Sequence, residues 1–151
     1  MEKSDSPMTK HTFTLHIDWP QGRNSVGNLS TQRLQTQISI PPEMDGPGIG
    51  TNPDEMLLGA AATCYIITLA AMYERSEIDA ELALKSEGIV DVTNGVFTYQ
   101  EIHHYVSITL NDRSERTQKL AERYAYKAEE TCMISKALKG NVVIQVHIKM
   151  N

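Results

Sequence analysis

The chain has few of the features that mark secreted, membrane or nucleic-acid-binding proteins. Only two of its 151 residues are cysteines, and a hydrophobic content of 40% allows a core of one domain without disulfide bonds. The net charge of −5 is spread, with no stripe of Lys and Arg among aromatic residues, so we expect no nucleic-acid partner. Residues 1–10 lack the apolar segment of a signal peptide, which predicts a flexible tail on a cytoplasmic protein.

Long hydrophobic runs are also scarce, and the one that occurs, Met56 to Met72, is only 17 residues long. It contains Gly59, Thr63 and Thr68, which dilute its apolar character. We therefore expect no membrane span. A helix that is apolar on all sides is more simply the central helix of a core, covered by a sheet or by another subunit. Cys64 lies in its middle.

The part of the chain before this run has the pattern of a small antiparallel meander. Apolar and polar residues alternate over residues 12–19, which predicts a half-buried strand. A turn over 20–24 and two further strands, over 26–29 and 34–40, should follow. The segment from Pro41 to Pro53 is rich in Pro and Gly and predicts a structured loop rather than a domain linker.

Capping signals place the start of the long helix at the end of this loop. Asn52 suits the N-cap position, Pro53 the first helical position and Glu55 the third. The helix should run to about Ser76.

The second half of the chain predicts a long hairpin and then a second helix. Strands over 81–91 and 96–111 are joined through Asn94-Gly95, a strong hairpin signal. Ser114 is a suitable cap for a helix that reaches Cys132. A short helical stretch over 133–138 and a last strand over 142–148 should complete the chain. This order of elements predicts an α+β fold in a single domain, residues 1–151.

Four stretches carry a family resemblance when they occur in this order. They are Gly22-Arg23, Gly50-Thr51-Asn52-Pro53-Asp54-Glu55, Ala62-Thr63-Cys64-Tyr65 and Cys132-x-x-Ser135-x-x-Leu138-x-Gly140-Asn141. Together they resemble the OsmC/Ohr family of thiol-dependent hydroperoxide reductases, over nearly the whole chain from about Trp19 onward. The resemblance implies an OsmC-like fold, in which antiparallel sheets wrap around long central helices in an intertwined homodimer with active sites at the interface.

The resemblance also implies a role for four residues. Cys64 matches the peroxidatic cysteine, which becomes a sulfenic acid, and Cys132 matches the resolving cysteine, which condenses with it to a disulfide. Arg23 matches the arginine that stabilises the thiolate and the peroxide, and Asp54 the acid that fixes this arginine. The implied substrates are organic hydroperoxides, and the implied reductant is a dithiol of the lipoyl type.

Two departures from the family pattern keep alternatives open. Asp54 replaces a glutamate; Glu55 could substitute, but consecutive helix residues point about 100° apart, so both cannot face the arginine. Met133 replaces a proline that would break the helix after Cys132. With these changes, a binding protein for an apolar or electrophilic ligand, with idle thiols, remains the alternative function. A thioester-handling enzyme is a third possibility, against which the paired cysteines argue.

A distance argument bears on how the site is assembled. Ten residues of continuous helix place Asp54 about 15 Å from Cys64 along the axis, which an aspartate cannot reach. Asp54, or the Arg23 that it holds, therefore either spans much of this gap or meets the Cys64 of another chain.

Other candidate residues are weaker. Five residues are candidates for an apolar pocket, or for ordinary core packing: Met44, Met56, Leu57, Tyr65 and Met133. His103 and His104 should face opposite sides of a strand, so we expect no metal site there. The implied chemistry uses neither a metal nor a flavin.

Overall fold

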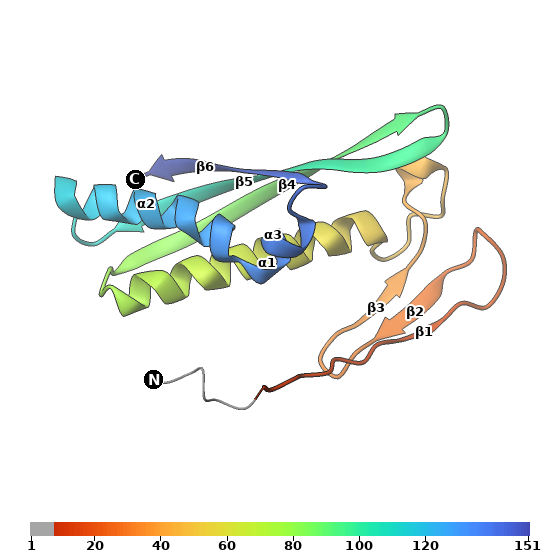
Figure 1. The fold of residues 1–151 in the computed structure, drawn as a ribbon. Coiled ribbons are helices and arrows are strands. Elements are labelled where there is room, and N and C mark those ends of the chain that lie inside the picture. Colours follow the sequence, from red (N-terminus) through yellow and green to blue (C-terminus); the bar gives the residue numbers. More distant parts are fainter. Residues whose placement is uncertain (1–7) are drawn as a thin grey trace. The chain divides into compact units, whose positions relative to one another are not determined.

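A computed structural model describes residues 8–151, so residues 1–7 of the expected tail lie outside the described residues (Figure 1). The described chain forms two compact units, which divide between Asn52 and Pro53. The first unit carries Arg23 and Met44. The second carries both cysteines.

The first unit contains a three-stranded antiparallel sheet. Its strands are β1 (His16–Asp18), β2 (Gly27–Ser30) and β3 (Gln35–Ile38), which pair in the order β1-β2-β3. The meander is confirmed, but the first strand is much shorter than residues 12–19 because β1 pairs with β2 only from His16 to Asp18. Its side chains are exposed, so the expectation of a half-buried strand is also wrong.

The loop that follows β3 is structured, as its composition predicts. It contains the 3₁₀ helix η1 (Pro42–Met44) and is fastened at Ser39, whose hydroxyl donates to the carbonyl of Ile49 (2.7 Å) and accepts from its N–H (2.8 Å). Gly50 has φ of +72° and lies against the carbonyl of Gln37, where a side chain would clash. The loop thus requires glycine at this position.

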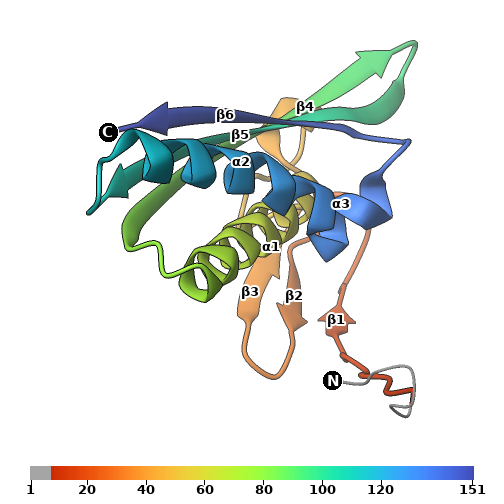
Figure 2. The ribbon, with the colours of Figure 1, turned by 60° about the vertical axis from the view of Figure 1, so that its left-hand side comes forward.

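The second unit consists of three helices on one face of a three-stranded sheet (Figures 1 and 2). Its elements, in order, are α1 (Pro53–Arg75), β4 (Ala80–Thr93), β5 (Val96–Leu110), α2 (Glu115–Thr131), α3 (Met133–Leu138) and β6 (Val143–Met150). The α+β class is confirmed, and α1 begins at the proline that the capping signals indicated.

The β4–β5 hairpin turns at Asn94 and Gly95, which both have positive φ, as the Asn-Gly signal predicts. The third strand differs from the expected antiparallel arrangement, because β6 pairs parallel to β5. The chain can return in this direction because α2 and α3 form a crossover connection long enough for a parallel pair. The sheet is therefore mixed.

Helix α1 buries one face within its unit. Ala61, Tyr65, Leu69 and Tyr73 recur every four residues and form its buried seam. The two tyrosine hydroxyls donate to backbone carbonyls of α2, each at 2.8 Å, which fastens the helices together. Length and composition alone would let α1 cross a membrane. Within the unit, only the seam just described is buried.

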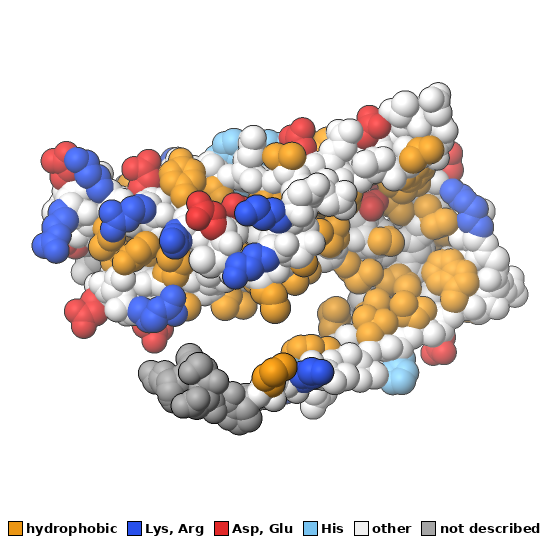
Figure 3. Space-filling view, viewed as in Figure 1, with side chains coloured by type: hydrophobic (Ala, Val, Ile, Leu, Met, Phe, Trp, Pro, Cys, Tyr) orange, Lys and Arg blue, Asp and Glu red, His pale blue; other side chains and the backbone are white. Residues whose placement is uncertain are grey.

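Hydrophobic side chains also gather along the outer side of α1 (Figure 3). Gly59, Ala60, Thr63 and Ile67 lie on this exposed face, and the side chain of Ile67 is 62% exposed. The sheet of its own unit thus covers only part of this helix, which carries no charged residue between Met56 and Met72.

Candidate functional site

The structure brings the two cysteines together as a pair of free thiols. Cys64 lies in the middle of α1 and is half-buried, whereas Cys132 lies between α2 and α3 and is completely buried. The thiol of Cys132 lies within hydrogen-bonding reach of the Cys64 sulfur. The pairing implied by the sequence motifs is therefore geometrically available in a single chain.

The backbone at Cys132 explains how its side chain is placed. Cys132 ends α2 and begins α3, with φ of −61° and ψ of 129°. Its N–H donates to the carbonyl of Ala128 (2.9 Å), and its own carbonyl accepts from the N–H of Lys136 (2.9 Å). One extended residue thus separates the two helices. The break that family members obtain from proline occurs here with Met133.

Several donors surround the Cys64 sulfur and favour its thiolate. Burial raises the pKa of Cys64, but hydrogen bonds from the Cys132 thiol, from the N–H groups of Ile134 and Met133 and from the Thr68 hydroxyl outweigh it. The pKa therefore lies below the ordinary value of a thiol. Because the thiolate is the nucleophilic form, Cys64 is the more reactive of the two cysteines.

The pKa of Cys132 moves in the opposite direction. Burial raises it, and the neighbouring Cys64 raises it further; donors from Ser135 and Ile134 counteract this only in part. Cys132 is therefore protonated when Cys64 is ionised and can donate to the thiolate. This asymmetry assigns the nucleophile to Cys64 on physical grounds.

The role of Thr68 gives a testable result. Thr68→Val keeps the shape of the side chain but removes the hydroxyl, so the pKa of Cys64 should rise. At neutral pH the rate of reaction with an alkylating agent should fall about three- to tenfold, the effect expected from one lost hydrogen bond. The pH dependence of alkylation measures both quantities. Thr98→Val, at an exposed position of β5, is the control and should match the wild type; equal profiles for both variants would contradict this role.

A buried histidine supports the residue next to the nucleophile. The ring of His104 stacks on Tyr65, with centroids 4.9 Å apart, and its Nδ1 lies 2.6 Å from the Ser86 hydroxyl. Burial lowers the pKa of His104 to about 4, so the ring is neutral at pH 7. His103 points to the other face of the sheet, where its Nε2 lies 2.8 Å from Glu101, as the strand alternation predicts.

His104 should make the protein sensitive to acid. Its pKa in the folded state, about 4, lies below its unfolded value of 6.5, so between these values the unfolded chain binds a proton that the folded chain does not. Stability should therefore be complete above pH 6.5 and fall by roughly 3 kcal/mol as the pH drops to 4.

Urea unfolding between pH 4 and 7 measures this loss. His104→Asn retains a partner for Ser86 but does not titrate, so its loss of stability over this range should be much smaller. Thr98→Asn, at an exposed and non-titrating position of the same strand, is the control and should keep the wild-type slope. An unchanged slope in His104→Asn would contradict the assignment.

Arg23 is held within the first unit. Its guanidinium donates to the carbonyls of Met44 (2.8 Å) and Asp45 (3.2 Å) and to the side chain of Asn24 (2.9 Å). These contacts orient the arginine through the loop backbone, which sequence patterns do not reveal. Anchoring of Arg23 by Asp54 stays a prediction.

The remaining sequence-predicted residues lie in several environments. Asp54 is in the first turn of α1, where its carbonyl accepts from the Tyr99 hydroxyl (3.3 Å), and the uninterrupted helix keeps it about three turns from Cys64. Glu55 follows it. Tyr65 is completely buried and is therefore a core residue rather than the lining of an open pocket. Met133 is 71% exposed, beside the cysteine pair.

Met56 and Leu57 are half-buried in α1, and Met44 is half-buried in η1. Among residues 8–151, no group of three or more His, Cys, Asp or Glu side chains is arranged to hold a metal ion.

Sequence reasoning missed three contributors to the site. Thr68 could have been found, because it lies four residues after Cys64 and so on the same face of the helix. The N–H groups of Met133 and Ile134 carry no side-chain signal and depend on where α3 begins. The sequence places His104 in a strand but does not distinguish it from His103; only the structure shows that His104 is buried against Tyr65.

Comparisons with known proteins identify the relatives of this chain. The OsmC-like protein family model matches residues 46–147. The chain is 58% identical to the uncharacterized protein YmaD of Bacillus subtilis over 141 residues, which cover 92% of this chain and 94% of that protein. It is 27% identical to an organic hydroperoxide resistance protein of Xanthomonas axonopodis pv. citri, over 88% of this chain and 92% of the relative.

The fold is similar to that of solved structures. The OsmC-like protein from Mycoplasma pneumoniae superposes with a TM-score of 0.73 at 19% identity, covering 94% of this chain and 99% of that one. This likeness supports an OsmC-like fold. By the match to the family model and the identity to its relatives, the chain belongs to the OsmC-like protein family.

Proposed function

We propose that this protein is a thiol-dependent peroxidase that reduces organic hydroperoxides to alcohols. The observation that carries the proposal is the pairing of Cys64, whose pKa is lowered, with a buried and protonated Cys132. A nucleophilic thiolate beside a second thiol is the arrangement that two-cysteine peroxide chemistry requires.

The reaction balances with these two residues and a dithiol. The Cys64 thiolate attacks one peroxide oxygen, the O–O bond breaks, and the leaving alkoxide takes a proton to become the alcohol. The Cys132 sulfur then attacks the Cys64 sulfenic acid, which releases water and forms a disulfide. A dithiol, which we propose to be of the lipoyl type, reduces the disulfide by exchange.

Arg23 supplies the cationic group in this proposal. Its guanidinium, fixed by the carbonyls of Met44 and Asp45, would stabilise the peroxide oxygens, and Asp54 or Glu55 would hold it there. The axial separation of Asp54 from Cys64 favours a site completed by a second copy of the chain. The exposed apolar face of α1 supports such a homodimer; light scattering should then give about twice the 16.9 kDa mass of the chain.

A preference for organic peroxides is part of the proposal and rests on exposed and half-buried apolar residues. Met133 is exposed beside the cysteine pair, and Met56 and Leu57 are half-buried about two turns of α1 before Cys64. We propose these residues, with Met44, as contacts for the hydrocarbon part of the substrate. The name of the relative from Xanthomonas supports the same substrate class.

Turnover with a dithiol tests the proposal. Purified protein with dihydrolipoamide should consume cumene hydroperoxide repeatedly and faster than hydrogen peroxide, and glutathione should support little turnover. The binding-protein alternative rests on Asp54 in place of glutamate, since the helix break after Cys132 is present without proline. Absence of turnover, with both thiols retained, would favour that alternative.

A further inference from the structure

Ser135 is a buried polar residue that the proposed chemistry has not yet used. It lies in the first turn of α3, three residues after Cys132, and its side chain is only 2% exposed. Its Oγ has no hydrogen-bond partner among the described residues. A buried hydroxyl without such a partner is costly, because its lost hydration is not replaced.

The surroundings of Ser135 show what its hydroxyl can serve. Cys132 is the N-cap of α3, and Ser135 is the third residue of this helix, a position that faces back toward the cap residue. The Ser135 side chain and N–H both act to lower the pKa of Cys132, against the larger effect of burial. The Ser135 hydroxyl therefore gains a strong hydrogen-bond acceptor when Cys132 becomes a thiolate.

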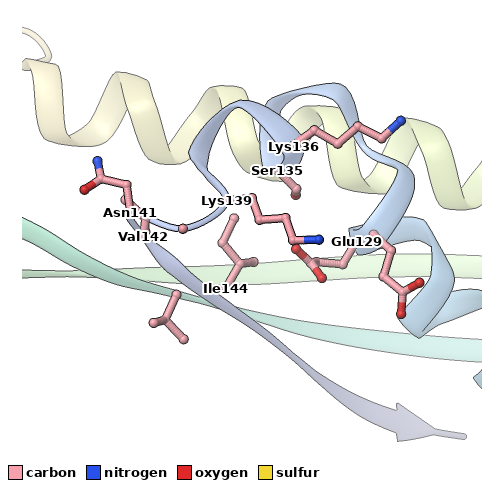
Figure 4. A pocket seen from close by; sticks show the side chains of 10 residues that line it. Glu129, Ser135, Lys136, Lys139, Asn141, Val142 and Ile144 are labelled. Carbon is pink, nitrogen blue, oxygen red and sulfur yellow. The ribbon is translucent and has the colours of Figure 1, made fainter.

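Ser135 also lines a cavity of about 610 Å³ between α3 and the start of β6. Lys136, Lys139, Glu129 and Asn141 line the same cavity (Figure 4). The cavity is large enough for water, and Ser135 forms part of its wall while the Oγ atom itself stays buried. Cys132 itself has no exposed surface.

We propose that the Ser135 hydroxyl is a catalytic hydrogen-bond donor for Cys132, which stabilises its thiolate when the Cys64–Cys132 disulfide forms and when it is reduced. The inference rests on the proposed peroxidase function. It deepens that function by assigning a donor to the resolving half of the cycle.

Burial determines the direction of the reductive step. Cys132 is inaccessible and Cys64 is half-buried, so the thiolate of the dithiol attacks the Cys64 sulfur. A new S–S bond forms to Cys64, the bond to Cys132 breaks, and its electron pair remains on the Cys132 sulfur, which then takes a proton from water. The second thiol of the dithiol attacks its own mixed-disulfide sulfur and releases Cys64 as a thiolate.

The leaving sulfur in the first exchange is the one with the raised pKa, which slows the step. A donor at Cys132 counteracts this, and the same donor raises the fraction of Cys132 thiolate available to attack the sulfenic acid. The donors of Cys64 are a different set, apart from the shared Ile134 N–H, so Ser135 should act on resolution and reduction but not on the first step.

Rapid kinetics of Ser135→Ala, Ser135→Thr and Lys136→Ala separates these steps. In Ser135→Ala, sulfenic acid formation should keep the wild-type rate, while disulfide formation and its reduction by dihydrolipoamide should slow about three- to tenfold. Ser135→Thr, which retains the hydroxyl, should restore the rates of disulfide formation and of disulfide reduction. Lys136→Ala, at the exposed neighbour on the same cavity, is the matched control. Slowing of all steps alike, or no slowing in Ser135→Ala, would overturn the assignment.

A second measurement does not depend on peroxidase activity. In the Cys64→Ser background, Cys132 is the only thiol, and its ionisation can be followed by absorbance at 240 nm. Adding Ser135→Ala should move the midpoint to higher pH, and adding Ser135→Thr should not. An unchanged midpoint overturns the role of Ser135 even if the enzyme turns over, whereas a shifted midpoint without peroxide consumption overturns the peroxidase proposal alone.

Discussion

Cys64→Ser is expected to abolish peroxide reduction. A serine hydroxyl remains protonated at neutral pH, so no nucleophile is left to attack the O–O bond, and the rate constant with cumene hydroperoxide should fall by about three orders of magnitude or more. Stopped-flow measurement of peroxide consumption by reduced protein, at one equivalent per chain, gives this rate directly. The variant should fold, since serine and cysteine are similar in size and Cys64 is only half-buried.

Thr98→Val is a suitable control for the stopped-flow measurement. Thr98 is exposed on β5, outside the residues assigned to the site, so its replacement should leave the rate near that of the wild type. Residual activity of Cys64→Ser close to the wild-type rate would show that another group reduces the peroxide, and the assignment of the nucleophile would be wrong.

Cys132→Ser is expected to change the oxidised product rather than the rate at which Cys64 reacts with the peroxide. The serine hydroxyl still donates to the Cys64 thiolate, so sulfenic acid should form at nearly the wild-type rate, but no internal disulfide can follow. One thiol instead of two is then lost per chain. With excess peroxide the unresolved sulfenic acid should proceed to sulfinic acid, and inactivation should be at least about tenfold more sensitive to peroxide.

Mass spectrometry of the oxidised variant checks this result. Dimedone should label Cys64 in Cys132→Ser and should label the wild type only weakly, because Cys132 competes for the sulfenic acid. Equal labelling of both proteins would contradict the role of Cys132 as the resolving residue.

The elements with local signals were predictable from the sequence. Pro53 marks the start of α1, Asn94-Gly95 the turn of the hairpin, and Ser114 the cap of α2, where its hydroxyl accepts from the Thr117 N–H. Each of these residues acts through its own backbone or through neighbours three residues away, so the signal and the structure are equally local.

Features that depend on packing across the fold were not predictable in this way. The parallel pairing of β6 follows from the path of α2 and α3, and alternation within β6 is the same in either direction. The extent of β1 depends on the length of β2. The break between α2 and α3 has no proline as a sequence signal. It is made by the extended backbone of Cys132, which ends one helix and begins the next.

At the site, the sequence identifies the two cysteines, whereas the structure shows how the surroundings of each affect its reactivity. The motifs name Cys64 and Cys132 but do not say which is the better nucleophile without the family. The structure adds a physical reason, since Thr68 and the N–H groups of Met133 and Ile134 surround Cys64, while Cys132 is completely buried. These backbone donors have no sequence signature.

The thiol count after a single equivalent of peroxide tests the central claim most directly. Reduced wild-type protein is mixed with one equivalent of cumene hydroperoxide per chain, the remaining thiols are titrated, and the peptides are mapped without reduction. We predict rapid loss of two thiols per chain and one peptide pair joined through Cys64 and Cys132. Two thiols remaining, or a disulfide that joins Cys64 to Cys64 of another chain, would contradict the account.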